Sequence, residues 1–464
     1  MKSKDTPTPA RPGLPGRIWR SVFRGPLRPR DDTDRKLIVF NHLVLHFRPI
    51  RVPEKTIRYT HTFGLGGMSM VLFLLLAATG VLLMFVYEPS PGYAHDSIVT
   101  LNTDVFFGKL IRNVHYWSAN LLIVVVILHL LRTYLTGAYF GVRQFNWVIG
   151  LVLLFCVLAS NFTGYLLPWD QLSYWAATIV TAMISYVPFA GPWLQGVIRG
   201  GQEIGPATLV NFYATHTTVL PVLIIVIMGF HFWRIRKARG VVIPRSPGEE
   251  YDKIPKFVLT LPQLLLRELA VAMILVAFVM VMSLLFDAPL GVAANPGMSP
   301  DPAKAPWYFL GFQELLLHFD PLFAVLVIPL LATIGLLMIP YVNYEEDTAG
   351  VFMASHRGRR MGGVAAAAAL LVTPLVVVVD DRWIDFGAWM PGLSPAIANG
   401  LIPAGILLLV LVTLYYVMKK KLPATNNEAV QTLFVLLATA FAVLTVVGVW
   451  FRGSGMGLVW PWNL

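Results

Sequence analysis

The sequence has a single cysteine and few charged residues. This residue, Cys156, lies inside an apolar run. Because each of these features needs at least two cysteines, the chain has no internal disulfide, no four-cysteine iron–sulfur cluster and no CxxCH site for a c-type haem. Charged residues make up 13% of the 464 positions, which is roughly half of the share in soluble domains. Hydrophobic residues make up 56%, and the mean hydropathy is +0.66. This composition indicates an integral membrane protein.

The formal net charge of +11 does not indicate nucleic-acid binding. Lys and Arg cluster between hydrophobic runs, where membrane topology explains them, so no nucleic-acid partner is expected. The first 40 residues are basic and proline-rich, and they lack the apolar stretch of a secretory signal. We expect them to form a cytoplasmic tail.

Nine stretches are apolar and long enough to cross a bilayer as helices, for which about 20 residues suffice. They lie at 67–87, 114–135, 146–167, 212–233, 264–286, 320–341, 361–380, 399–418 and 430–450. Loops rich in Lys and Arg alternate with loops that are poorer in base. The positive-inside rule therefore predicts a cytoplasmic N-terminus and an outside C-terminus.

Two of these spans carry a histidine near each end. The run "HYWSANLLIVVVILH" separates His115 from His129 by fourteen residues, which is about four turns less 40°, or about 21 Å along one helix face. The run "HTTVLPVLIIVIMGFH" separates His216 from His231 by fifteen residues, which leaves about 60° of rotation. A kink at Pro221 is expected to bring this second pair onto one line.

Both spans cross the membrane in the same direction, so the histidines should pair by depth. His115 and His216 would lie level near the outer face, and His129 and His231 near the inner face. Haem iron takes two axial ligands, and neutral imidazole is a suitable one. A single membrane histidine often only hydrogen-bonds a neighbouring helix, but four at matched depths favour two stacked bis-imidazole haem sites.

Glycines in the other two early spans repeat the same spacing. Gly66 and Gly80 lie fourteen residues apart, as do Gly150 and Gly164. Glycine allows a rigid body such as a haem edge to approach the backbone. Close packing of helices through small residues is the alternative explanation.

Two arginines flank the first histidine pair. Arg112 lies three residues before His115, and Arg132 lies three residues after His129. Each is a candidate partner for haem propionates, although each could equally be an anchor that extends its charge to the membrane surface.

Residues 40–341 resemble cytochrome b of the quinol–cytochrome c reductase (cytochrome bc) complexes. The resemblance rests on "RNVHYWSANLLIVVVILHLLRTYLTG", "TGYLLPWDQLSYWA", "FYATHTTVLPVLIIVIMGFHFWRIRK" and "PWYFLGFQELL". The fifteen-residue histidine spacing and "LPWDQ" are similar to the plastid-type and Gram-positive branch. That branch often splits the protein after the fourth span, whereas here both halves are fused and followed by additional helices.

The resemblance implies an electron-transport enzyme of a bacterial inner membrane. Quinol would be oxidised at the outer face, with one electron passing to a Rieske iron–sulfur protein and then to a c-type cytochrome or another acceptor. The other electron would pass through an outer low-potential haem (His115, His216) and an inner high-potential haem (His129, His231). It would then reduce a quinone on the cytoplasmic side, and protons would be translocated. A homodimeric complex in membrane lipid is also implied.

The outer quinol site is assigned on the resemblance to two motifs. Its residues would be Pro168, Trp169, Asp170, Trp307 and Tyr308. Family members usually carry an acid directly before the Trp-Tyr pair, where this chain has Pro306. Because quinol oxidation needs a base within reach, we expect Glu314 to accept the proton, with Asp170 and His318 as weaker candidates.

A second departure concerns covalent haem. Plastid-type relatives attach an extra haem through a cysteine two positions before the first glycine pair, where this chain has Gly64. We therefore expect two non-covalent b haems and no covalent haem. For the inner quinone site, Arg236 and Lys237 lie at the correct end of the fourth span, but the positive-inside rule also explains them.

The predicted fold is an all-α integral membrane protein with a four-helix haem-binding bundle, a C-terminal block and about nine spans. The predicted units are a basic tail and amphipathic segment (1–55), a di-haem domain (56–240), a cytoplasmic linker (241–262), a quinol-site domain (263–345) and additional helices (346–464). Two other functions remain open: a di-haem anchor of a respiratory dehydrogenase without bifurcation, and a transporter with histidine proton relays.

Overall fold

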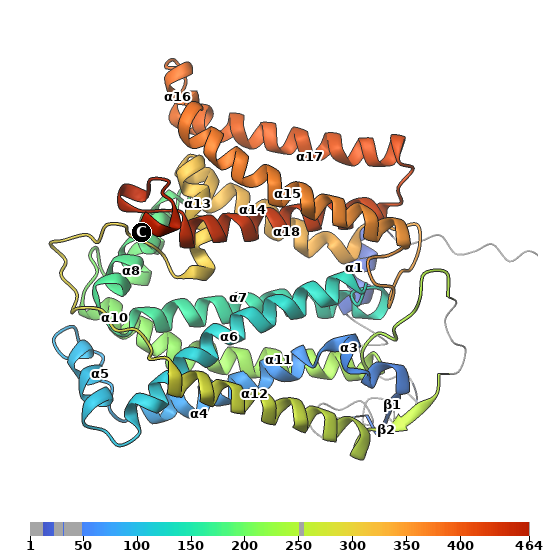
Figure 1. The fold of residues 1–464 in the computed structure, drawn as a ribbon, viewed down its shortest axis with the longest axis horizontal. Helices are drawn as coiled ribbons and strands as arrows, with labels where there is room; N and C mark the ends of the chain where they lie inside the picture. The colour runs from blue at the N-terminus through green and yellow to red at the C-terminus, as the bar shows by residue number, and fades with distance from the viewer. Residues whose placement is uncertain (1–12, 23–30, 32–48, 250–254, 464) are drawn as a thin grey trace, which may run out of the picture.

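The computed structural model describes residues 13–22, 31, 49–249 and 255–463, and most of these are helical (Figure 1). Within these ranges, nine helices are long and apolar enough to cross a membrane. The nine predicted spans are thereby confirmed, and the chain is an all-α membrane protein. At most 28% of the residues in any of these spans are buried inside the protein, which suits helices that face lipid.

The α-helical parts of the spans have the following bounds: α4 (Leu65–Leu83), α6 (Gly108–Leu135), α7 (Gln144–Leu166), α10 with α11 (Pro206–Ala214 and Leu220–Lys237), α12 (Leu265–Leu285), α14 (Ile328–Met338), α15 (His356–Trp383), α17 (Ile402–Lys421) and α18 (Asn426–Trp450). Short 3₁₀ or π turns extend four of them, so that the full spans are Gly141–Leu166, Thr260–Leu285, Phe323–Tyr341 and Ala396–Lys421. The shorter elements are α1 (Leu14–Val22), β1 (Arg51–Pro53), α3 (Tyr59–Thr62), α5 (Ala94–Thr103), α8 (Gln171–Met183), α9 (Gly191–Arg199), β2 (Phe257–Leu259), α13 (Leu310–His318) and α16 (Phe386–Trp389).

The first four spans form one bundle, with α4 packed on α6 and α11 packed on α7 (Figure 1). Helix α12 packs along α6 on the outside of this bundle. Buried aliphatic side chains hold the helices together, including Leu72, Ile123, Val157 and Val279. Lipid tails are as apolar as these side chains, so van der Waals packing between the helices, rather than transfer out of water, holds this core together.

The later spans form a second block on the other side of α7 (Figure 1). Helix α18 packs along α15 and also against α13, and α17 lies at the edge of the block. Helix α18 begins at a reciprocal cap, in which Thr425 Oγ1 accepts from the Glu428 backbone N–H and Glu428 accepts from the Thr425 N–H. This cap fixes where the last helix starts.

Two long loops lie at one end of the molecule, which we call the outer end in keeping with the predicted orientation; the opposite end is called the inner end. The 168–211 loop forms α8 and α9, and the 287–319 loop leads into α13. Asp170 and Ala293 form an antiparallel bridge between them. The backbone N–H of Gln171 donates to Val292 O at 2.9 Å, so the two loops form one surface.

At the inner end, β1 pairs with β2 in antiparallel register, with Arg51 opposite Leu259. This pairing joins the start of the first bundle to the linker that leads into α12. Most of the predicted basic tail, namely residues 1–12, 23–30 and 32–48, lies outside the described residues, as do residues 250–254 of the predicted linker. The predicted domain boundaries stay predictions.

Candidate functional site

The outer histidine pair comes together across the bundle. His115 comes from α6, and His216 comes from the turn of helix just before α11. Their ring centroids lie 6.2 Å apart, with an angle of 70° between the planes. Two imidazoles bound to one metal ion from opposite sides, each with a bond of about 2.0–2.1 Å, give a separation of roughly 6 Å. His115 and His216 therefore have a spacing that would let one metal ion be held between them.

A π turn places His216 correctly relative to His231. Residues Thr215–Val219 form this turn, and the Leu220 N–H donates to the Thr215 carbonyl, five residues back. A π turn contains one residue more than an α turn. The fifteen-residue separation therefore behaves like fourteen, which matches the separation of His115 and His129. A kink at Pro221 was expected to align the pair, but the π turn, which ends two residues before this proline, provides the alignment.

The inner pair consists of His129 from α6 and His231 from α11, which lie within electrostatic range of each other. Among the described residues, none makes a hydrogen bond to the buried Nδ1 of His231. A buried nitrogen without a partner is uncommon in a folded protein. The donor set is thus the same at both depths: two partly buried imidazoles from facing helices.

Each of the four predicted glycines lies against one of these histidines. A Cβ at Gly80 would come 3.3 Å from His115 Cε1, and one at Gly66 would come 3.4 Å from His129 Cε1. The remaining two are Gly150, which faces His231, and Gly164, which faces His216. The glycines were expected to admit a haem edge, and this stays a prediction; the contacts show that each makes room for an imidazole from the adjacent helix.

Two threonines that the sequence analysis missed hold the outer imidazoles. Thr79 Oγ1 lies 2.9 Å from His115 Nδ1, and Thr163 Oγ1 lies 3.4 Å from His216 Nδ1. The Ser160 carbonyl also lies 2.9 Å from His216 Nδ1. Such contacts fix the Nδ1–H tautomer and leave Nε2 free to bind a metal. A signal was present in the sequence, because each threonine directly precedes an outer glycine.

Comparison with known proteins agrees with this geometry. The family model described as cytochrome b/b6/petB matches residues 52–239. The cytochromes b6 of Tupiella akineta and of Prochlorococcus marinus (strain MIT 9515) are each 44% identical to this chain over 173 residues. That stretch is 37% of this chain and 80% and 79% of those two proteins. The chain belongs to the cytochrome b/b6 family.

A solved structure shares the fold of this cytochrome b along most of its length. It is a chain of a hyperthermophilic respiratory Complex III, with a TM-score of 0.61 and 20% sequence identity. The match covers 90% of this chain and 97% of the other chain. The second helical block is therefore part of the same fold. As a member of this family, the protein is a b-type haem protein of membrane electron transport.

The predicted propionate partners contact backbone carbonyls. Arg112 donates to Ala288 O at 2.9 Å and to Pro289 O at 2.6 Å, and so ties α6 to the loop after α12. Arg132 Nε donates to His61 O at 2.8 Å. Arg236 lies in the last turn of α11. Their predicted roles toward haem and quinone stay predictions.

The outer loops bring the two predicted quinol-site motifs to the same end of the bundle. Trp169 is buried and has a positive φ of 50°, and Asp170 caps α8 by accepting the Ser173 N–H at 2.9 Å. The other Asp170 oxygen accepts the Gly291 N–H at 2.9 Å. Pro168 directly precedes this turn. Asp170 therefore binds the 287–319 loop to α8.

Trp307 and Tyr308 lie in a short 3₁₀ turn that follows Pro306. Trp307 Nε1 donates to Asn120 Oδ1 on α6 at 2.7 Å, and both aromatic rings pack against the apolar core of the first bundle. Burial raises the pKa of the Tyr308 phenol well above its usual range, so the phenol keeps its proton at physiological pH. Tyr308 can then donate a hydrogen bond.

Glu314 lies on α13 and is 0% exposed. Its carboxylate pairs with Arg452, whose Nη2 lies 2.9 Å from Oε2. His318 Nε2 lies 3.7 Å from the same oxygen, and His318 Nδ1 lies 2.5 Å from Asp380 Oδ2. Although burial opposes the charged imidazole, its contacts with Asp380 and Glu314 raise the pKa of His318 to about 9. The role of Glu314 as proton acceptor stays a prediction.

Proposed function

We propose that this chain is the cytochrome b subunit of a quinol:cytochrome c (or equivalent acceptor) oxidoreductase. Quinol would be oxidised at the outer end, with one electron going to a Rieske iron–sulfur protein. The other electron would cross the membrane to a quinone at the inner end, and protons would be translocated. The observation that carries the proposal is the presence of two facing imidazole pairs at two depths of one bundle in a cytochrome b/b6 family member.

Two non-covalent b haems, held by His115 with His216 and by His129 with His231, would supply one-electron carriers at the two depths. The chain itself fixes the ligand geometry. Gly80 and Gly164 admit the outer imidazoles, and contacts at each Nδ1 orient them. An Nδ1–H that donates to oxygen makes imidazole a stronger electron donor, which favours the oxidised iron. This supports an outer site of lower potential than the inner site.

The outer loops supply the binding surface for quinol. Tyr308 would donate a hydrogen bond to the quinol oxygen. The indole rings of Trp169 and Trp307 would line the site. Pro168 and Asp170 would hold the shape of the turn. The two loops are held together where Asp170 accepts the backbone N–H of Gly291 in the partner loop. Glu314 stays the proposed proton acceptor. An unchanged rate and pH profile of quinol oxidation in Glu314→Gln would contradict this assignment.

The proposed context is a bacterial inner membrane, with the N-terminus in the cytoplasm and the C-terminus outside. Partners would be a Rieske protein, a c-type cytochrome or other acceptor, and a second copy of the complex. Arg236 near the inner end would contribute to the inner quinone site. The basic segments between spans support this orientation.

A bifurcation experiment separates this function from the di-haem anchor of a dehydrogenase. In membranes with the inner site inhibited, adding an oxidant together with quinol should increase haem b reduction, because each electron sent to the Rieske protein releases a second one. A Rieske protein should also copurify with the chain. An anchor without bifurcation would show haem b oxidation on the same addition and no Rieske protein.

A further inference from the structure

The last part of α18 and the turn that follows it contact the outer loop that carries Trp307 and Tyr308. After α18, residues 451–459 fold back on themselves, with the Val459 N–H donating to Phe451 O at 3.0 Å. This turn and the last part of α18 contact the 301–314 segment at points before and after the Trp307–Tyr308 pair. We call residues 448–456 the C-terminal clamp.

A buried ion pair is the strongest contact of the clamp. Arg452 is 1% exposed, and its Nε lies 3.1 Å and 3.2 Å from the two Glu314 oxygens. Its Nη1 donates to Asp381 on α15 at 2.9 Å and to Met456 O at 3.1 Å. Arg452 thus links α13, α15 and its own turn. A shift of α13 away from Arg452 would leave two buried charges without partners, which would strongly destabilise the fold. The ion pair therefore holds α13 in one position.

Hydrogen bonds hold the loop on the other side of the aromatic pair. Asp301 accepts from Ser454 Oγ at 2.5 Å and from the Gly455 N–H at 2.6 Å. Lys304 Nζ donates to Val449 O at the end of α18 at 3.0 Å. These contacts occur three to six residues before Trp307, whereas Glu314 lies seven residues after it. The aromatic pair therefore sits between two attachment points on the clamp.

Close backbone packing supports the same attachment. A Cβ at Gly448 would come 2.9 Å from Leu310 Cβ, and a Cβ at Gly311 would come 2.7 Å from Thr445 Oγ1. Both distances are shorter than real Cβ contacts allow, so α13 and α18 approach each other through these two glycines. Little room is left for α13 to shift against α18.

We propose that the C-terminal clamp sets the position of Trp307 and Tyr308 at the outer quinol site, and that Arg452 is its positioning residue. The inference rests on the proposed quinol site. It assigns a role to helices that lie beyond the 52–239 match to the family model. Arg452 contacts Glu314 and neither Trp307 nor Tyr308, so it acts on the aromatic pair through α13.

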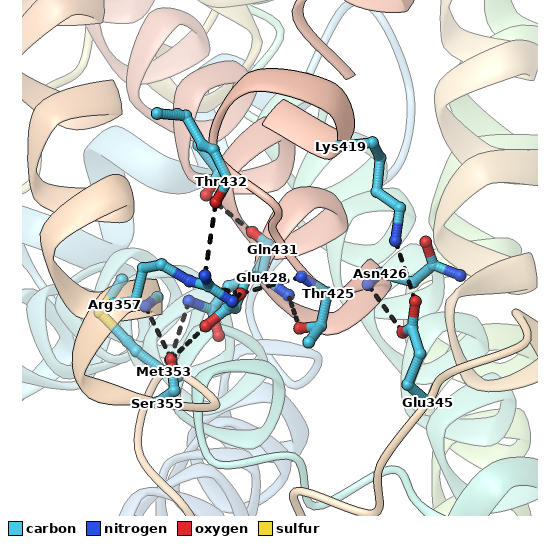
Figure 2. Close-up of polar contacts among 12 residues, drawn as sticks. Glu345, Met353, Ser355, Arg357, Lys419, Thr425, Asn426, Glu428, Gln431 and Thr432 are labelled. Carbon is cyan, nitrogen blue, oxygen red and sulfur yellow. Dashed lines mark hydrogen bonds and ion pairs between the residues drawn. The ribbon is translucent and has the colours of Figure 1, made fainter. Parts of the chain in front are cut away.

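A control ion pair lies at the opposite end of α15 and α18, although its arginine side chain is 46% exposed. Arg357 on α15 donates to Glu428 on α18 through Nη2 at 2.6 Å and Nε at 3.0 Å (Figure 2). Figure 2 also shows the surrounding inner-end contacts of Ser355, Thr425 and Lys419. This ion pair joins α15 to α18, whereas Arg452 joins α15 and α13 to the turn after α18, and it lies at the opposite end of α18 from Arg452. Arg357→Gln therefore removes a helix–helix ion pair without touching the clamp.

The test compares Arg452→Gln with Arg357→Gln in the membrane-embedded complex. We expect Arg452→Gln to keep both b-haem components, while kcat/KM for quinol falls roughly 10-fold, equivalent to about 1.4 kcal/mol. Arg452→Lys should recover part of this loss, and Arg357→Gln should stay within about twofold of wild type. Electron entry from the inner quinone site should be the same in all three.

Quinol oxidation in Arg452→Gln within about twofold of wild type would overturn the inference. If Arg452→Gln fails to accumulate, Asp301→Ala replaces it, because Asp301 is exposed and its loss removes only the first attachment point. A wild-type rate for Asp301→Ala would then overturn the inference. Failure of the proposed function is distinct from either outcome, since the wild-type protein itself would then oxidise no quinol.

Discussion

Replacing His129 with leucine is expected to remove one of two b-type haem components and to stop electron transfer to the inner quinone site. Leucine fills a similar volume but has no lone pair with which to bind iron. We expect the quinol-driven reduction of the inner site to fall by on the order of 100-fold, equivalent to about 3 kcal/mol. His231→Leu should give the same result, because both side chains serve one site.

A redox-difference spectrum of each variant in purified form measures this effect. His356→Leu is the control: this histidine is exposed at the start of α15, so its loss should leave both components in place. His115→Leu and His216→Leu should remove the other component. Retention of both components in His129→Leu would contradict the pairing of histidines by depth.

The second large effect is expected from adding one methyl group at Gly164. A Cβ there would lie under 3.0 Å from two atoms of the His216 ring, and the imidazole could not keep its position. Gly164→Ala should therefore lose most of the outer haem component and lower quinol oxidation by on the order of 10-fold. The distance from an added Cβ to the nearest histidine ring atom ranks the expected effects at the other sites: 3.3 Å at Gly80, 3.4 Å at Gly66 and 3.7 Å at Gly150. Gly150→Ala should be the mildest.

Gly67→Ala is the matched control for this series. Within the part of the chain that the structure describes, no atom outside its own helix turn lies within 4 Å of a Cβ at Gly67. Both substitutions raise helix propensity by about 1 kcal/mol, so a difference between Gly164→Ala and Gly67→Ala isolates the contact with the imidazole. Equal haem content in the two variants would show that the glycine spacing serves helix packing instead.

The spans and the histidine pairs could be predicted from sequence because both depend on local spacing. Nine apolar runs predict nine helices, and fourteen-residue intervals place His115 and His129 on one face. The π turn at Thr215–Val219 could not be predicted in this way, because helical spacing rules assume a uniform rise and twist. Pro221 marked the correct region, but it follows the change in register and was expected to act as a kink.

Contacts between residues far apart in the chain could not be predicted from the sequence either. The spacing of Glu314 indicated a carboxylate near the outer site, yet its partner Arg452 lies 138 positions later and belongs to no shared motif. Thr79 and Thr163 contact the outer imidazoles only because α4 packs against α6 and α7 packs against α11, and this packing is not visible in the sequence. The helices that follow residue 346 carried no recognisable motif, and their contact with α13 depends on the packing of the whole second block.

The most direct test of the account is a potentiometric titration of the purified protein followed at the b-haem absorption bands. The account predicts two b-type components of different potential, with the lower one absent from His115→Leu and His216→Leu. We expect the lower potential at the outer site, because Thr79 and the Ser160 carbonyl contact its imidazoles. A protein without haem, or with a single b-type component, would contradict the account.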